Sequence, residues 1–179
     1  MLRNKNVIIF LLKFFGAYFI MFALYSGYLG KTQVAEGIFS CAPITKAVAH
    51  ASVWVVEQFG YASEAIQNSG ELSLTMYINE TAVSRVIEGC NAVSIIVLFT
   101  AFIIAFSNRF VPTLFYVLFG SLLIYAINIL RIAVIGIGLY EFPEYKEFLH
   151  EILFPALIYG LVLVLWVIWV QNYSKVKHA

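Results

Sequence analysis

Three residues whose side chains could carry out acyl transfer lie at the ends of apolar segments. Cys90 starts one such segment, Arg131 lies late in the next, and His150 starts the last. If successive segments cross a bilayer in alternating directions, all three side chains reach the same face. A thiol can act as a nucleophile, a guanidinium can stabilise an oxyanion, and an imidazole can transfer protons near neutral pH. The spacing therefore predicts a catalytic site built from three separate segments.

Each of these residues also has a structural interpretation. A lone cysteine is most often a small buried apolar residue. An arginine in a span can extend its guanidinium to the interface or pair with a glutamate there. A histidine can simply mark the start of a helix at the interface. We expect a helix to begin at Asn91, so that its free N–H groups favour the nucleophilic thiolate of Cys90.

The composition identifies a membrane protein. Of 179 residues, 62% are hydrophobic and 12% are charged, and the mean hydropathy is +0.89. Soluble domains are about half apolar and a quarter charged. The net charge of +1 gives no reason to expect a nucleic-acid partner. The length predicts a single domain that occupies residues 1–179.

We predict an all-α integral membrane protein with four transmembrane helices. A span needs about 20 apolar residues. The first apolar run is too long for a signal peptide and lacks a clear cleavage site, so we interpret it as a retained span. The predicted spans cover residues 7–29, 90–106, 111–138 and 151–170.

Basic residues predict the orientation of these spans. The short segments that would share one side of the bilayer carry Arg3, Lys5, Arg109, Lys175 and Lys177. All ten acidic residues are glutamates, and they would lie on the opposite side. We therefore expect both termini in the cytoplasm and the candidate site on the outer side.

The outer segment, residues 30–89, is predicted to contain structure of its own. Residues 43–59 repeat apolar side chains at helical spacing, which fits an amphipathic helix at the interface or a helix packed on the spans. Residues 61–71 read as a polar linker. Residues 72–78 alternate and favour a strand, and residues 82–87 can return as the second strand of a β-hairpin.

Arithmetic places Arg131 near the outer boundary of the membrane. Nineteen helical steps separate it from Pro112, or about 29 Å, which is about the thickness of the hydrocarbon core. Asn128 lies one turn before Arg131 and is expected to orient it, and Glu151 is expected to orient His150. The remaining histidines lack a comparable context: His50 lies in the amphipathic segment and His178 in the basic tail.

Three short motifs resemble those of the exosortase/archaeosortase family. They are Glu-Gly-Cys-Asn-Ala around Cys90, Asn-Ile-Leu-Arg-Ile around Arg131 and Leu-His-Glu around His150. The closest branch is the short exosortase F type of Bacteroidetes. Many members have Ser-Gly after the cysteine, where this chain has Asn91-Ala92, and many have about eight spans.

This resemblance implies a membrane cysteine protease or transpeptidase. Cys90 would form the thioester, Arg131 would stabilise the oxyanion, and His150 would be the acid and base. The substrates would be exported proteins that end in a short motif, a hydrophobic span and a basic cluster. The enzyme would lie among the lipids of the bacterial inner membrane with its site on the periplasmic side and would need no cofactor. The resemblance allows either water or an amine as the acyl acceptor.

Other functions are weighed against this one. Cys41 is a second outer thiol, which we expect to be structural, although a Cys41–Cys90 disulfide is an alternative. A thiol–disulfide oxidoreductase would normally carry a C-x-x-C pair, which the sequence lacks. The two cysteines and scattered histidines lack the spacing of metal ligands. A non-enzymatic membrane assembly or transport subunit remains the alternative function.

The predicted orientation can be tested with a cysteine introduced at Ser174. In intact spheroplasts, an impermeant thiol reagent should not label this cysteine, because the C-terminal segment lies in the cytoplasm. Lysed spheroplasts serve as the positive control and should be labelled. Labelling of Ser174→Cys from outside intact cells would contradict the four-span arrangement.

Overall fold

Long apolar runs form the helices that dominate this chain, as a computed structural model of residues 1–179 shows. It describes residues 2–35, 37–107, 109–145, 147–148 and 154–172. The described helices are α1 (Leu2–Thr32), α2 (Pro43–Gln58), α3 (Val93–Ala105), α4 (Phe110–Glu141) and α5 (Phe154–Asn172), with short 3₁₀ turns η1 (Glu88–Asn91) and η2 (Pro143–Tyr145).

Three of the helices are long and apolar enough to cross a membrane. They comprise Val7–Thr32 within α1, the whole of α4, and Pro155–Asn172 within α5. α3 is apolar but has only 13 residues, which extend about 20 Å. The prediction of a helical membrane protein is therefore confirmed, whereas a fourth span over residues 90–106 is not established by length.

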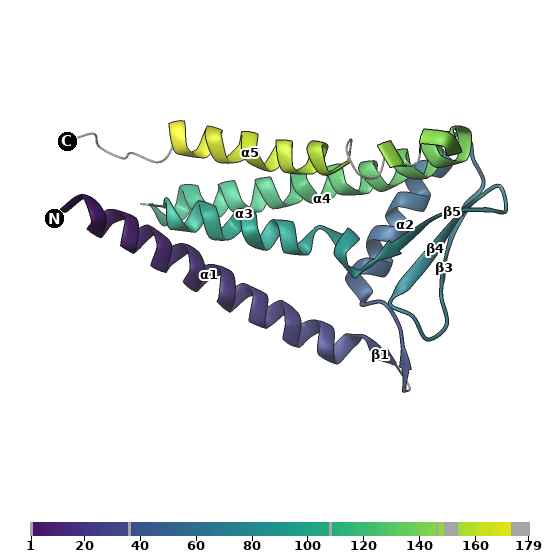
Figure 1. The fold of residues 1–179 in the computed structure, drawn as a ribbon, viewed down its shortest axis with the longest axis horizontal. Helices are drawn as coiled ribbons and strands as arrows, with labels where there is room; N and C mark the ends of the chain where they lie inside the picture. The colour runs from purple at the N-terminus through teal and green to yellow at the C-terminus, as the bar shows by residue number, and fades with distance from the viewer. Residues whose placement is uncertain (1, 36, 108, 146, 149–153, 173–179) are drawn as a thin grey trace.

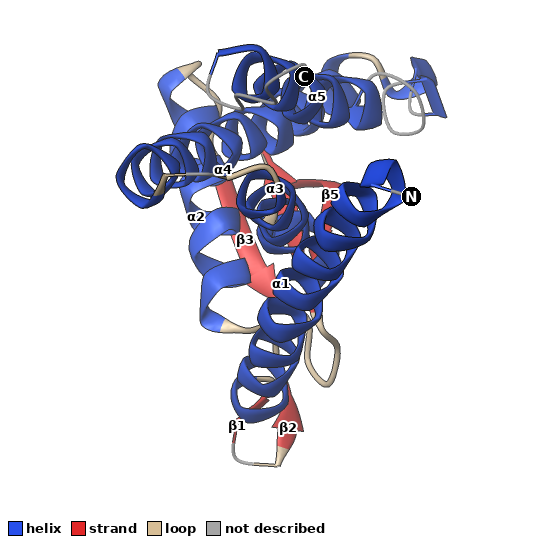
Figure 2. Ribbon diagram, turned by 90° about the vertical axis from the view of Figure 1, so that its left-hand side faces the viewer, coloured by secondary structure: helices blue, strands red, loops and turns tan. Residues whose placement is uncertain are grey.

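α3, α4 and α5 lie lengthwise beside one another, α1 is inclined away from them, and α2 and the strands lie at one end (Figure 1). α3 contacts α1, α4 and α5, and α4 also contacts α5. Viewed along the bundle, α1 runs beside α3 (Figure 2). The start of α1 and the end of α5 lie at the end of the bundle opposite the sheet (Figure 1).

The outer segment contains a three-stranded antiparallel sheet in the order β3-β4-β5. The predicted hairpin is present as β4 (Ser73–Ile78) and β5 (Thr81–Ile87). The prediction of a plain linker over residues 61–71 is wrong, because β3 (Ser63–Gln67) pairs there with β4. A second hairpin, formed by the two-residue strands β1 (Val34–Ala35) and β2 (Ile38–Phe39), was also not expected.

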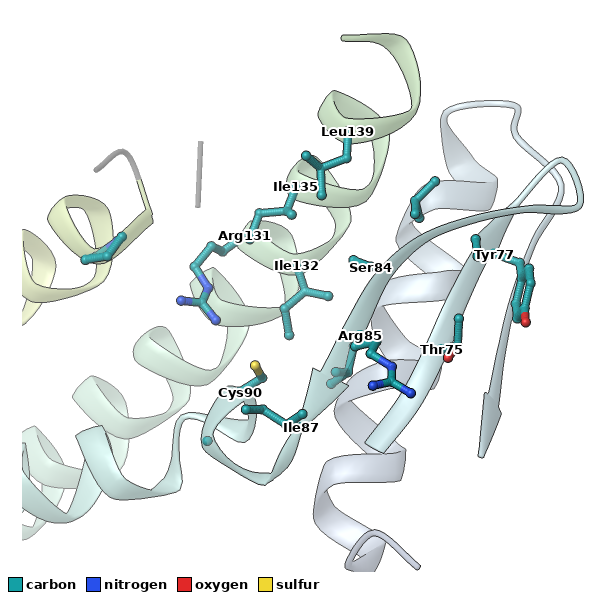
Figure 3. Close-up of a pocket in the computed structure, with 15 residues that line it drawn as sticks. Thr75, Tyr77, Ser84, Arg85, Ile87, Cys90, Arg131, Ile132, Ile135 and Leu139 are labelled. Atoms are coloured by element: carbon teal, nitrogen blue, oxygen red, sulfur yellow. The ribbon is translucent and has the colours of Figure 1, made fainter. Parts of the chain in front are cut away.

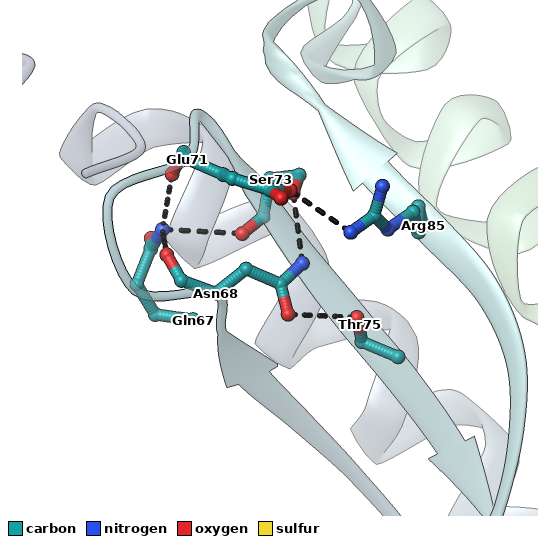
Figure 4. Close-up of polar contacts among 6 residues, drawn as sticks. All are labelled: Gln67, Asn68, Glu71, Ser73, Thr75 and Arg85. Carbon is teal, nitrogen blue, oxygen red and sulfur yellow. Dashed lines mark hydrogen bonds and ion pairs between the residues drawn. The ribbon is translucent and has the colours of Figure 1, made fainter. Parts of the chain in front are cut away.

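Polar contacts hold the turn between β3 and β4 (Figure 4). The side-chain amide of Gln67 donates to the backbone carbonyls of Glu71 and Ser73 at 2.7 and 3.1 Å. Asn68 donates to Ser73 Oγ at 2.8 Å. Arg85 on β5 forms an ion pair with Glu71 at 2.9 Å. This ion pair fixes the turn against the sheet, although both side chains are more than half exposed and the pair adds little stability.

α2 packs as a layer on the sheet and on α4. Its buried residues Val48, Ala49 and Val56 join Leu74 and Met76 of β4 in one core cluster, which α4 completes with Ile132 and Ala133. Of the two placements that the sequence allowed for this helix, the structure has it packed against the span α4 and the sheet. Its remaining face includes exposed Trp54 and His50.

A second core lies inside the helix bundle, and α4 takes part in both. Phe99 and Ile103 of α3 meet Ile124 of α4 and Val162 and Trp169 of α5 in this cluster. α4 is therefore the element that joins the bundle to the layer formed by α2 and the sheet.

The contact between α3 and α4 depends on Gly120. A Cβ at this position would lie 2.4 Å from Cζ of Phe99, whose side chain is fully buried. We expect Gly120→Ala to destabilise the protein by about 1–3 kcal/mol, because a packed ring must move. Gly160→Ala in α5 is the matched control, because nothing lies within 4 Å of its added Cβ. Thermal unfolding in detergent measures both, and equal melting temperatures would contradict this packing.

Candidate functional site

Cys90 lies in a 3₁₀ turn that connects the sheet to the bundle. β5 ends at Ile87, η1 covers Glu88–Asn91, and α3 starts at Val93. The prediction that the helix begins at Asn91 is therefore wrong by two residues. The first helical N–H group, that of Val93, is taken by Asn91 Oδ1 at 2.9 Å, so it does not face the sulfur.

The backbone at Ala92 separates η1 from α3, so that the helix starts at Val93. Its φ of 64° and ψ of −2° are left-handed, a conformation that glycine adopts at low cost and alanine rarely does. This is also the position at which many exosortases carry glycine. The departure from the family pattern in sequence therefore coincides with a backbone that glycine would suit.

A polar cluster holds both sides of Cys90. Glu88 accepts hydrogen bonds from the Ala42 N–H at 2.6 Å and from the Thr45 hydroxyl, at the N-terminus of α2. Asn91 donates to Thr45 Oγ1 at 2.9 Å and to the hydroxyl of Tyr25 in α1 at 2.7 Å. The turn that carries the thiol is thereby tied to α1 and to α2.

Asn128 of α4 fixes the same turn from the bundle. Its side-chain amide donates to the Cys90 carbonyl at 2.7 Å, and the residue is only 1% exposed. We expected Asn128 to orient Arg131, whereas the hydrogen bond that it forms in the structure positions the backbone of Cys90. A buried amide is costly without a partner, so this bond favours one placement of the turn.

Arg131 lies three residues after Asn128 and points toward the same turn. Cys90 interacts with its guanidinium electrostatically and as a hydrogen-bond partner, and Tyr159 of α5 adds a further electrostatic contact. Figure 3 shows the guanidinium directed toward the Cys90 sulfur. Its buried Nε has no hydrogen-bond partner within the described part of the chain.

Cys90 and Arg131 line one pocket of about 830 Å³ (Figure 3). β5 and β4 form one wall, α4 forms another, and Pro155 at the start of α5 contributes to the lining. The apolar residues of α4 that line it are Ile132, Ile135 and Leu139. This volume accommodates a ligand much larger than water, and it is in the range of small-molecule and peptide sites.

The third predicted catalytic residue, His150, lies outside the described residues, as does its predicted partner Glu151. The described chain resumes at Phe154, and Pro155 lines the pocket of Cys90 and Arg131. His50 is exposed on α2. His178 also falls outside the described residues.

The second cysteine occupies a different environment. Cys41 is 1% exposed and joins the core between α2 and the sheet, and both cysteines are free thiols. Burial, together with the nearby Glu88 carboxylate, raises the pKa of the Cys41 thiol to about 11. The alternative of a Cys41–Cys90 disulfide is therefore not the state in the structure.

Sequence reasoning missed the role of Glu88. Its sequence context marks it only as the first residue of a motif, and no local pattern indicates that it accepts hydrogen bonds at the N-terminus of α2. Its partners Ala42 and Thr45 lie more than 40 residues away. Arg85, which also lines the pocket, was likewise not singled out.

Fold and site define a helical membrane protein with a small mixed outer layer and a Cys–Arg pocket where the two meet. No protein-family model, no curated protein and no solved structure matches this chain. The geometry of this pocket and the three sequence motifs are therefore the basis on which a function is proposed.

The environments of the two thiols predict different reactivity. At pH 8, about one Cys41 in a thousand is a thiolate with a pKa of about 11, and the side chain is buried. Iodoacetamide should therefore add to the native protein once, at Cys90, and Cys41→Ser should not alter the count. Intact-protein mass spectrometry measures the adducts. Rapid labelling of Cys41 in the native protein would contradict its burial.

Proposed function

We propose that this protein is a membrane cysteine protease or transpeptidase of the exosortase kind. The observation that carries the proposal is the meeting of Cys90 and Arg131 in one pocket. The two residues come from segments 41 positions apart in the sequence, and one belongs to a turn while the other belongs to a long helix. A structural cysteine has no need for a neighbouring cation, or for a cavity of about 830 Å³.

The reaction assigns one role to each residue. His150 takes the proton of the Cys90 thiol, and the sulfur attacks the scissile carbonyl carbon and forms a C–S bond. The negative charge on the carbonyl oxygen is stabilised by Arg131. When the C–N bond breaks, the leaving amine takes the proton from His150, and a thioester remains on Cys90. Water or an amine then gives a proton to His150 and attacks the thioester, the C–S bond breaks, and the sulfur takes that proton to restore the thiol.

The position of Arg131 beside Cys90 in the pocket lining supports its role in this reaction. A guanidinium presents several donors in one plane, which suits an oxyanion. The hydrogen bond from Asn128 to the Cys90 carbonyl supports the proposal in a second way, because it orients the turn in advance. Precise positioning before binding lowers the cost of reaching the transition state.

We propose further that four helices cross the inner membrane, with the site on the periplasmic side and both termini in the cytoplasm. α3 would be the shortest pass, and it is supported in this role by its position among the three long helices. Arg131 lies 21 residues after the start of α4, or about 31 Å along it. That length matches the hydrocarbon thickness, which supports a pocket at the outer boundary.

The substrates would be exported proteins that end in a motif, a hydrophobic span and a basic cluster. A span that lies beside the bundle would bring the motif to the level of Cys90. Apolar side chains exposed along α1 and α4, such as Leu24, Phe115 and Leu122, provide surfaces that accept lipid or another helix. The enzyme site and the cleavage motif of the substrate would then lie at the same depth, at the membrane boundary.

Replacement of each catalytic residue tests the proposal. Cys90→Ala and His150→Ala should abolish processing, and Arg131→Lys should reduce the rate about 10²–10³-fold, as loss of an oxyanion donor does. Arg109→Lys, at the other end of α4, is the matched control and should retain full activity. The assay follows cleavage of a co-expressed reporter that ends in a C-terminal signal encoded in the same genome.

Mass spectrometry of the wild-type enzyme should also detect an acyl adduct on Cys90. Equal protein abundance in every variant excludes a folding defect. Full activity of Cys90→Ala would overturn the proposal and favour the non-enzymatic alternative of a membrane assembly or transport subunit.

A further inference from the structure

The pocket extends beyond the Cys–Arg pair along most of β5. Its lining includes six consecutive residues of this strand, Ala82 to Ile87. Successive side chains of a strand point to opposite faces, so a pocket on one face touches only every second residue. Contact with six in succession means that the pocket reaches both sides of β5 around its edge, and Thr75 and Tyr77 show that it also covers part of one face of β4.

This edge is the free edge of the sheet. The strand order is β3-β4-β5, so β5 pairs with β4 on one side only. No backbone hydrogen bond from the other side of β5 to any described residue is present. An unpaired edge exposes N–H and C=O groups that can bind another extended chain.

A β-bulge limits the usable length of this edge. Ser84 pairs with Met76 and Ala82 with Tyr77, so Val83 is an extra residue without a partner on β4. Val83 packs instead beside Ile135 and Leu139 of α4. Because bulges interrupt pairing, the regular run begins at Ser84 and continues to Ile87, three residues before Cys90.

We propose that β5 binds the substrate as an added β-strand, through the extended segment that precedes the scissile bond. This inference rests on the proposed function and names how the same site recognises its peptide. The exported part of the substrate approaches from the outer layer, and its hydrophobic span continues into the bilayer. The segment therefore runs in the direction of β5, parallel to it, and brings the scissile carbonyl to Cys90.

The walls of the groove fit a peptide of this kind. Ile132, Ile135 and Leu139 of α4 face β5 across it, so one face of the peptide would contact apolar side chains. Among the described residues of the lining, the charged ones are Arg131 and Arg85, and Arg85 is paired with Glu71. The groove therefore favours an extended peptide with neutral or acidic side chains. Backbone pairing would account for affinity, and these walls for specificity.

The test uses a set of acetylated hexapeptides with a C-terminal vinyl sulfone and the full-length enzyme in lipid nanodiscs. The parent peptide is Val-Ser-Val-Glu-Val-Ala. The Cys90 sulfur adds to the vinyl group and forms a C–S bond, the neighbouring carbon takes a proton, and nothing leaves. Each of the remaining peptides carries one N-methyl group on a different backbone nitrogen, which removes one donor and leaves the side chains unchanged.

Parallel pairing predicts an alternating pattern in the rate of Cys90 modification. Within the four residues next to the vinyl sulfone, methylation should slow the reaction about fivefold at every second position, the effect of one lost hydrogen bond. At the positions between them, the rate should change less than twofold. Cys90→Ser, which should not be modified, is the control for the site of addition.

A second measurement maps the bound peptide. A photoreactive diazirine side chain at the fourth residue before the vinyl sulfone should cross-link to β5 or to the facing residues of α4. Cross-links to β3, the opposite edge of the sheet, would overturn the proposal.

The outcomes distinguish failure of strand addition from failure of the proposed protease function. Modification of Cys90 with rates that do not alternate overturns strand addition, while processing of the reporter would still support the protease. Failure of every hexapeptide to modify Cys90 overturns strand addition, and together with an active Cys90→Ala variant it overturns the protease as well.

Discussion

A carboxylate at the start of a helix is the contact on which the rest of this structure depends. Glu88 accepts hydrogen bonds from the first residues around the N-terminus of α2, and Asn91 connects the same cluster to α1. Acidic groups are favoured at helix N-termini, and hydrogen bonds to a charged group contribute about 1.5–3 kcal/mol each. Because Glu88 and Asn91 flank Cys90, the cluster that joins the outer layer to the bundle also determines where the thiol lies.

The two cores of the protein meet on α4, which explains why the pocket lies where it does. The outer core uses Ile132 and Ala133 of this helix, and the bundle core uses Ile124. Asn128 and Arg131 lie between these two contacts. Both are therefore held by packing on either side, and Asn128 reaches the Cys90 carbonyl while Arg131 reaches its side chain. A rigid helix is a better support for such a pair than a loop would be.

The parts of the fold that depend on local pattern could be predicted from the sequence, and the parts that depend on distant partners could not. The apolar runs gave the long helices and the alternation of residues 73–78 gave β4, because burial dictates both patterns. β3 reads as a polar linker since Glu64 and Gln67 interrupt any apolar alternation, and only pairing with β4 makes it a strand. The motifs identified Cys90 and Arg131 as candidate site residues. The left-handed conformation of Ala92 and the hydrogen bond between Glu88 and Ala42 could not be predicted, because they depend on segments that meet only in the folded chain.

The hydrogen bond between Asn128 and the Cys90 carbonyl has a consequence for how this protein relates to its membrane. It attaches the thiol to α4, the helix that also carries Arg131, so the two groups move as one body. α4 has 32 residues and a length of about 48 Å, which exceeds the hydrocarbon thickness of about 30 Å. Bilayers of different thickness change the tilt of such a helix. The internal geometry of the pocket is then preserved, while its height above the lipid changes. If the protein is the protease proposed above, the spacer between cleavage motif and span in a substrate of the same bilayer acts as a molecular ruler, whose best length follows membrane thickness.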